Sequence, residues 1–141
     1  MTTAIRTTPS DQVDRGLLAL RIVAGAIFAA HGWQKLVTYG ITGVTGGFTA
    51  MGIPLPGIVG PAIGALELLG GTALILGLFG RLVPALLAFD MLGAIVFVEF
   101  RKGFFMPNGY EFVLSLLGAS IALALSGPGR FSASAVLARR R

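Results

Sequence analysis

The sequence contains no cysteine, and this absence excludes several kinds of redox chemistry within the chain. Without thiols there is no CxxC motif, no thiolate-held iron–sulfur cluster, no disulfide and no catalytic thiol. Histidine occurs once, at His31, so the chain cannot hold a bis-histidine haem by itself. A redox role would therefore depend on a partner protein or on a cofactor held without a covalent bond. We expect no redox centre and no metal site of the chain's own.

Charged residues are also scarce. They make up 12% of the chain, whereas about 25% is typical of a soluble domain. Hydrophobic residues reach 55% and the mean hydropathy is +0.85, which together indicate an integral membrane protein. A length of 141 residues leaves little room for a second domain, so residues 1–141 are predicted to form one membrane domain. The basic residues lie at the ends of apolar segments, and they do not indicate nucleic-acid binding.

Four apolar segments predict an all-α fold, a bundle of four transmembrane helices. A helix needs about 20 residues to cross a hydrocarbon core of about 30 Å. The last segment has a length at the lower limit, and Gly127-Pro128-Gly129 ends it sharply. The predicted spans are residues 16–37, 58–79, 82–100 and 110–126.

The distribution of Lys and Arg predicts the orientation of this bundle. Four spans place both termini on one side, which then carries Arg6, Arg15, Arg81, Arg130, Arg139, Arg140 and Arg141. The opposite side carries only Lys35, Arg101 and Lys102. The positive-inside rule then predicts both termini in the cytoplasm, in a bacterial plasma (inner) membrane. Residues 1–15 and the basic residues 130–141 are the predicted cytoplasmic tails, and the polar N-terminal stretch predicts no cleavable signal peptide.

The connection between the first two spans carries a periodic apolar pattern. Val44, Phe48, Met51 and Leu55 follow one another at spacings that place them on one face of a helix. The segment is too short to cross the bilayer, so it predicts a short interfacial or re-entrant helix on the outer side. A hydrophobic loop resting on the bundle is the open alternative.

Glycine is abundant, with 21 residues, and many glycines lie inside the predicted spans. Gly60 with Gly64, Gly25 with Ala29, and Gly118 with Ala122 form small-xxx-small pairs. Such pairs let helix backbones approach closely in a bilayer, either within the chain or in a homo-oligomer.

Three ionisable residues lie deep inside the apolar segments: Arg21, Glu67 and Asp90. A charge near the centre of a membrane helix costs about 2.5–3.5 kcal/mol on insertion scales, so such residues usually face the bundle interior and find a partner. A rise of about 1.5 Å per residue places Glu67 and Asp90 near the midplane and Arg21 about 9 Å inside the cytoplasmic end. We expect a buried polar network in which Arg21 pairs with Glu67, and Asp90 is a third member.

A second polar group lies toward the outer end of the bundle. His31 and Lys35 are one turn apart on the first helix, and together with Trp33 and Glu67 they are the candidate ligand-binding residues. Glu99 lies about 180° from Asp90 on an α-helical count, so we expect these two carboxyl groups not to face one site. No catalytic residue is identified.

Three interpretations of these charges remain open. They can be structural pairs that fix the helix register. They can line a pocket for a quinone or another small molecule, with His31 donating to a quinone oxygen and Glu67 or Asp90 as the proton partner. They can also form a path for protons or solutes, although the absence of visible repeats and broken helices disfavours a solute carrier.

The order of several motifs resembles the DoxX family of small membrane proteins. The first helix reads LRIVAGAIFAAHGWQKL, and the next stretch reads GGFTAMGIPLPG. The second helix contains ELLGG, from Glu67 to Gly71, and Arg81 opens the third. The closing motif is LALSGPGRFS, and the resemblance covers nearly the whole chain, from Leu17 to Ser132.

The resemblance implies a four-helix inner-membrane protein that is associated with oxidoreductase systems. Members are linked to thiosulfate–quinone oxidation, to detoxification of quinone-like compounds, and to a membrane complex with superoxide dismutase and a sulfurtransferase. The positions that match family motifs are Arg21, His31, Lys35 and Glu67, whereas Asp90 matches none. We therefore expect a subunit that anchors a redox enzyme in the lipid bilayer and binds a quinone or another hydrophobic redox substrate. The alternative is a non-enzymatic scaffold, an accessory subunit of a larger membrane complex whose buried charges are structural.

Overall fold

The computed structural model describes residues 9–139, and the regular structure in this part of the chain is helical. The bounds are α1 Pro9–Trp33, η1 Gln34–Thr38, α2 Gly40–Ala50, α3 Pro56–Leu76, α4 Leu82–Ala94, η2 Ile95–Glu99, η3 Phe100–Lys102, α5 Glu111–Ser126 and α6 Ala133–Ala138. The segments η1 and η2 are π-helical turns that extend α1 and α4, and η3 is a short 3₁₀ turn.

Each of the four predicted spans contains one main helix: α1, α3, α4 or α5. Pro56–Leu76 and Leu82–Lys102 are long and apolar enough to cross a membrane by length and composition, and Glu111–Ser126 is a shorter apolar helix. Residues 9–15, which were expected in the N-terminal tail, already belong to α1. Arg6, Arg140 and Arg141, which entered the predicted orientation, lie outside the described residues.

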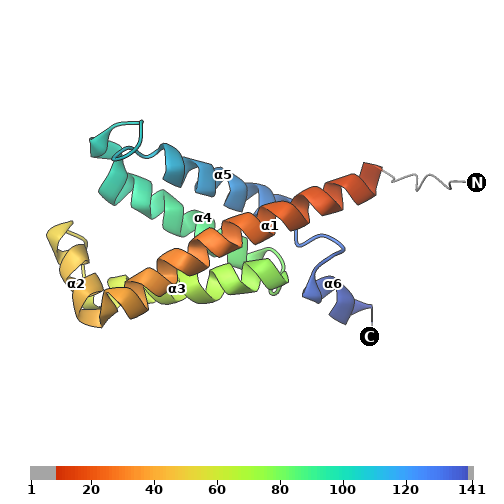
Figure 1. Cartoon of the computed structure of the whole chain (residues 1–141), viewed down its shortest axis with the longest axis horizontal. Helices are drawn as coiled ribbons and strands as arrows, with labels where there is room; N and C mark the ends of the chain where they lie inside the picture. Colours follow the sequence, from red (N-terminus) through yellow and green to blue (C-terminus); the bar gives the residue numbers. More distant parts are fainter. Residues whose placement is uncertain (1–8, 140–141) are drawn as a thin grey trace, which may run out of the picture.

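The main helices form two pairs. Helix α1 packs mainly on α3, and α4 packs mainly on α5. Figure 1 shows the two pairs close together at the end where α6 lies, and farther apart toward the end that carries α2 and the α4–α5 connection.

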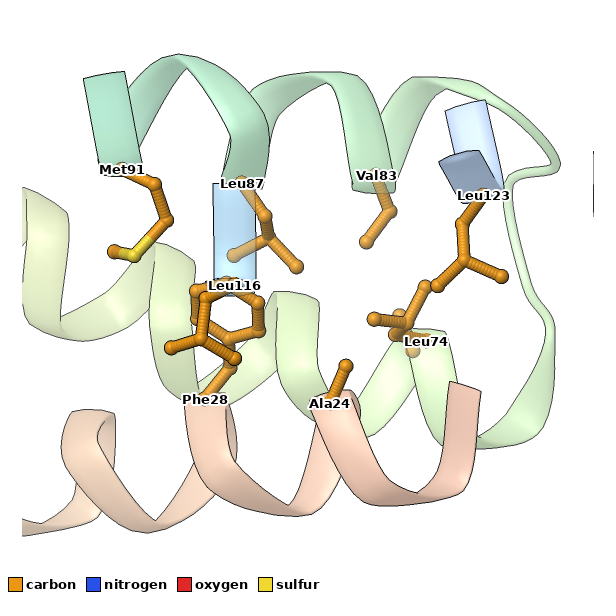
Figure 2. Close-up of a cluster of buried hydrophobic side chains, with 9 residues drawn as sticks. Ala24, Phe28, Leu74, Val83, Leu87, Met91, Leu116 and Leu123 are labelled. Atoms are coloured by element: carbon orange, nitrogen blue, oxygen red, sulfur yellow. The ribbon is translucent and has the colours of Figure 1, made fainter. Parts of the chain in front are cut away.

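The apolar core is built by side chains from all four main helices. Figure 2 shows Phe28 of α1, Leu74 of α3, Leu87 of α4 and Leu116 of α5 pointing toward one another. Phe28 and Leu87 are fully enclosed, with 1% and 0% of their surface exposed. Because lipid offers no hydrophobic driving force between helices, this tight packing supplies much of the attraction between the pairs.

The connection between α1 and α3 is helical, as its periodic apolar pattern predicts, and the loop alternative is wrong. Val44 and Phe48 of α2 are buried, and they pack over Gly60 at the start of α3. Leu55 does not continue this face, because α2 ends at Ala50 and Leu55 turns the chain into α3 with a left-handed φ of 51°. Helix α2 therefore covers the N-terminal end of α3.

Candidate functional site

A cavity of about 560 Å³ lies between the two helix pairs at the α2 end. Its walls are mostly apolar and strongly aromatic, with contributions from every main helix, from α2 and from the α4–α5 connection. The aromatic side chains on the wall are Phe28, Phe48, Phe89, Phe97 and Phe112. The cavity is within the size range of about 300–1,000 Å³ that is usual for small-molecule sites.

An ion pair lies on the apolar wall of the cavity. Lys35 Nζ donates to Glu67 Oε2 at 2.5 Å, and the Glu67 side chain is only 5% exposed. Lys35 lies in the π-helical turn η1, directly above Gly64 of α3, where a small residue leaves room for its stem. His31, one turn earlier on α1, also lines the cavity, with its ring centroid 6.0 Å from that of Phe112. The sequence placed Glu67 in a network with Arg21 and placed His31 and Lys35 in a separate outer group, whereas the structure brings Glu67 to Lys35.

Asp90 completes the polar part of the wall from the opposite helix pair. It lies on α4, is 7% exposed, and interacts electrostatically with both Glu67 and Lys35. Its Oδ2 accepts no hydrogen bond from the part of the chain that the structure describes. Glu67, Asp90 and Lys35 thus gather two carboxyl groups and one ammonium group from both helix pairs.

Glu99 also lines the cavity, which contradicts the expectation that it faces away from the site of Asp90. The expectation assumed an unbroken α-helix between the two residues. The structure instead has the π-helical turn Ile95–Glu99, which changes the angle between successive side chains. Glu99 accepts a hydrogen bond from Lys102 Nζ at 3.1 Å, so this carboxylate is already paired at the mouth of the cavity.

Arg21 does not pair with Glu67, and this part of the predicted network is wrong. Its Nη2 donates to the carbonyl of Phe131 at 3.0 Å, and its Nη1 donates to the carbonyl of Pro128. The guanidinium lies beside Gly77, where any side chain would collide with Nη1. Gly77 is ten residues beyond Glu67, about 15 Å farther along α3. Arg21 therefore binds the backbone carbonyls within its reach at the α6 end.

The segment that receives Arg21 is fixed by further hydrogen bonds. Ser132, which is 1% exposed, caps α6 by accepting from the Ala135 amide and donates to the Gly129 carbonyl. Asp14 on α1 accepts from the Arg130 amide at 3.0 Å. Sequence reasoning missed these roles because the acceptors are main-chain carbonyls, although the GPGRFS motif itself was visible. This cluster joins the C-terminal segment to α1, and none of the residues named in it lines the cavity.

Trp33 is not a cavity residue, although it was a candidate for ligand binding. It is 56% exposed and does not line the cavity, because it lies on another face of α1 than His31 and Lys35. Phe89 and Phe97, by contrast, both line the cavity and are 76% and 65% exposed on the outer surface of α4 and η2. The cavity therefore reaches the apolar flank of the bundle.

Comparison with known proteins gives a consistent result. The family model described as DoxX matches residues 16–99. The chain is 42% identical over 112 residues to the protein named putative oxidoreductase CatD of Bacillus subtilis (strain 168), covering 79% of each chain. It is 33% identical to the uncharacterized membrane protein Rv3486 of Mycobacterium tuberculosis, over 88% of this chain and 82% of the relative. It is 32% identical to the inner membrane protein YqjF of Escherichia coli (strain K12), over 90% of this chain and 95% of the relative. No solved structure matches the chain significantly.

Proposed function

Because the chain belongs to the DoxX family of membrane proteins, we propose that it is a four-span subunit that serves a redox enzyme. In this proposal it anchors the enzyme in the inner membrane and binds a quinone or a similar hydrophobic redox molecule. The observation that carries the proposal is the apolar, aromatic cavity with the Lys35–Glu67 ion pair on its wall. Aromatic walls suit a flat ring, and a small number of polar groups fixes its orientation.

A quinone is also suited to the way in which the cavity reaches the surface. Phe89 and Phe97 are exposed on an apolar flank, where a membrane protein contacts lipid. A molecule dissolved in the bilayer could enter there without crossing water. Its ring would then meet His31 and Lys35, which can both donate hydrogen bonds to a carbonyl oxygen.

The redox part of the proposal is supported by the relative named putative oxidoreductase. A chain without cysteine has no thiol with which to carry electrons. We therefore assign electron transfer to a partner protein of the same membrane complex. The open face of α5 around Gly118, where an added methyl group would meet nothing, offers room for such a partner or for a second copy of this chain.

Binding of decylubiquinone tests the proposed function. The His31→Ala and Glu67→Gln variants are expected to lose binding at least about tenfold relative to the unchanged protein, since each loses a polar group of the cavity wall. Binding is measured by titration calorimetry on purified protein, and circular dichroism checks that each variant is folded.

The matched control is Trp33→Phe, which changes an exposed aromatic residue two positions from His31 and outside the cavity. It should bind decylubiquinone as the unchanged protein does. If His31→Ala and a folded Glu67→Gln also bind normally, the quinone site is excluded and the buried charges remain structural.

Four spans place both termini on one side of the membrane, and the excess of Lys and Arg on that side predicts that it is the cytoplasm. The native chain has no cysteine, so a single introduced thiol is labelled without background. In spheroplasts, an impermeant maleimide should label Asn108→Cys, in the exposed α4–α5 connection, and should label Ala138→Cys of α6 only after the membrane is opened. The reverse pattern would contradict the orientation, and labelling of both variants in closed spheroplasts would show that α5 does not cross the membrane.

A further inference from the structure

Asp90 is a hydrogen-bond acceptor on the cavity wall. The described residues do not use all of its capacity to accept hydrogen bonds. It is 7% exposed and lines the cavity from α4, and its Oδ2 has no hydrogen-bond partner among the described residues. Buried carboxyl oxygens in proteins are nearly always hydrogen-bonded, so an exception of this kind needs an explanation. A ligand that donates a hydrogen bond would supply one.

Three cations of the described chain are already engaged. Lys35 donates to Glu67, Lys102 donates to Glu99, and Arg21, midway along α1, is bound to main-chain carbonyls. The ionisable groups that line the cavity are therefore three carboxyl groups, one ammonium group already in an ion pair, and the His31 ring. Hydrogen-bond acceptors predominate on the polar part of the wall.

The position of Glu67 strengthens this imbalance. Its carboxyl group interacts directly with that of Asp90, so two groups of the same kind converge on one part of the cavity. Neighbouring carboxyl oxygens in an apolar setting attract a polarised hydrogen atom more strongly than either would alone. A quinone carbonyl has no hydrogen to offer them, since it only accepts.

We infer that the cavity preferentially binds the hydroxyl-bearing form of its aromatic ligand, a hydroquinone or another phenol, with the hydroxyl group donating to Asp90. The inference rests on the proposed function and names the substrate class of the same site. A phenolic hydroxyl is both donor and acceptor, so its oxygen can also receive a free N–H of Lys35 while its hydrogen satisfies Asp90. A quinone can accept from Lys35 or His31, but it has no hydrogen for Asp90.

The test compares two probes that differ in the donor hydrogen, 4-hexylphenol and its methyl ether 4-hexylanisole. Their binding to the purified full chain is measured by displacement of decylubiquinone. The unchanged protein should bind the phenol at least about tenfold more tightly than the ether, because a hydrogen bond to a buried carboxyl group is at stake. In Asp90→Leu the preference should fall to near unity, and in Asp90→Asn, which keeps the shape but weakens the acceptor, it should be reduced.

The control is Trp33→Phe, which changes an exposed aromatic residue outside the cavity. It should keep the full preference for the phenol. Equal displacement by phenol and ether in the unchanged protein overturns the inference and leaves the quinone site intact. A preference that stays at its full size in a folded Asp90→Leu protein also overturns it, whereas a failure of decylubiquinone itself to bind overturns the proposed function as well.

Discussion

Replacing Arg21 with methionine is expected to lower the free energy of unfolding in detergent by about 3 kcal/mol or more. The guanidinium is 2% exposed and donates to the carbonyls of Pro128 and Phe131. A hydrogen bond from a charged donor contributes about 1.5–3 kcal/mol, and here two are lost together while both carbonyls are left without this donor. Methionine has a similar length, so the loss reports the hydrogen bonds more than a cavity. Denaturant titration followed by circular dichroism measures it.

Lysine at the same position should give an intermediate loss. Its ammonium group keeps the charge but lacks the planar fork that lets Arg21 reach two carbonyls at once. Arg139→Met is the control, since Arg139 is exposed beyond α6 and its removal should leave stability nearly unchanged. A loss below about 1 kcal/mol in Arg21→Met would show that the two hydrogen bonds do not hold the C-terminal segment.

A double variant at Arg21 and Glu67 distinguishes the observed geometry from a direct Arg21–Glu67 pair. Arg21 and Glu67 have separate partners at different levels of the bundle. Their single losses should therefore add within about 0.5 kcal/mol in the double variant Arg21→Met/Glu67→Gln. Recovery of part of the loss in the double variant would instead indicate that the two side chains bind each other.

The sequence was informative where hydropathy and helix period decide the structure. Long apolar segments in lipid must form helices, because the bilayer offers no other partner for the backbone. The four main helices and the helical cap at Val44 and Phe48 follow from this rule. The Lys35–Glu67 pair was not predicted, because the depth count placed Glu67 near the midplane with Arg21 and placed Lys35 with His31 in an outer group.

The partner of Arg21 could not be predicted in this way. The depth of Arg21 in the predicted membrane suggested a carboxylate as its partner, because the charges of side chains can be seen in a sequence. The actual acceptors are the carbonyls of Pro128 and Phe131, which every residue type carries and no sequence pattern marks. Only the return of the chain after α5 brings them to Arg21, midway along α1.

The π-helical turns are the second feature that the sequence concealed. Angular positions were counted at a fixed 100° per residue, which is valid only for an unbroken α-helix. The turns Gln34–Thr38 and Ile95–Glu99 depart from that count, and each carries a charged cavity residue, Lys35 or Glu99. Such turns are frequent at functional sites, where they redirect side chains. Here they bring polar groups onto the wall at the outer end.

Alanine at Gly32 or Gly71 is expected to destabilise the protein by about 2–3 kcal/mol, because it forces α1 away from α3. The new methyl group would lie 2.2 Å from the Leu68 amide nitrogen in the first case and 2.4 Å from the Ala29 amide nitrogen in the second. Both obstacles are helix backbone, which cannot rotate aside as a side chain could. Separation of the helices would also pull Lys35 away from Glu67, so decylubiquinone binding should weaken in parallel with stability.

Gly118 and Gly93 provide matched controls on α5 and α4, since an added methyl group meets nothing within 4 Å at either position. Alanine there should be neutral or stabilising by up to about 1 kcal/mol, as helix propensity predicts. A loss at Gly118 would instead indicate that this open face packs against another protein.

The double variant Gly32→Ala/Gly71→Ala should lose less than the sum of its single losses. The two glycines share one helix crossing, and once the first methyl group has separated α1 from α3, the second finds room already made. Strictly additive losses of stability would show that the two methyl groups act independently. That result would contradict a single rigid crossing of the α1 and α3 backbones, on which the cavity depends.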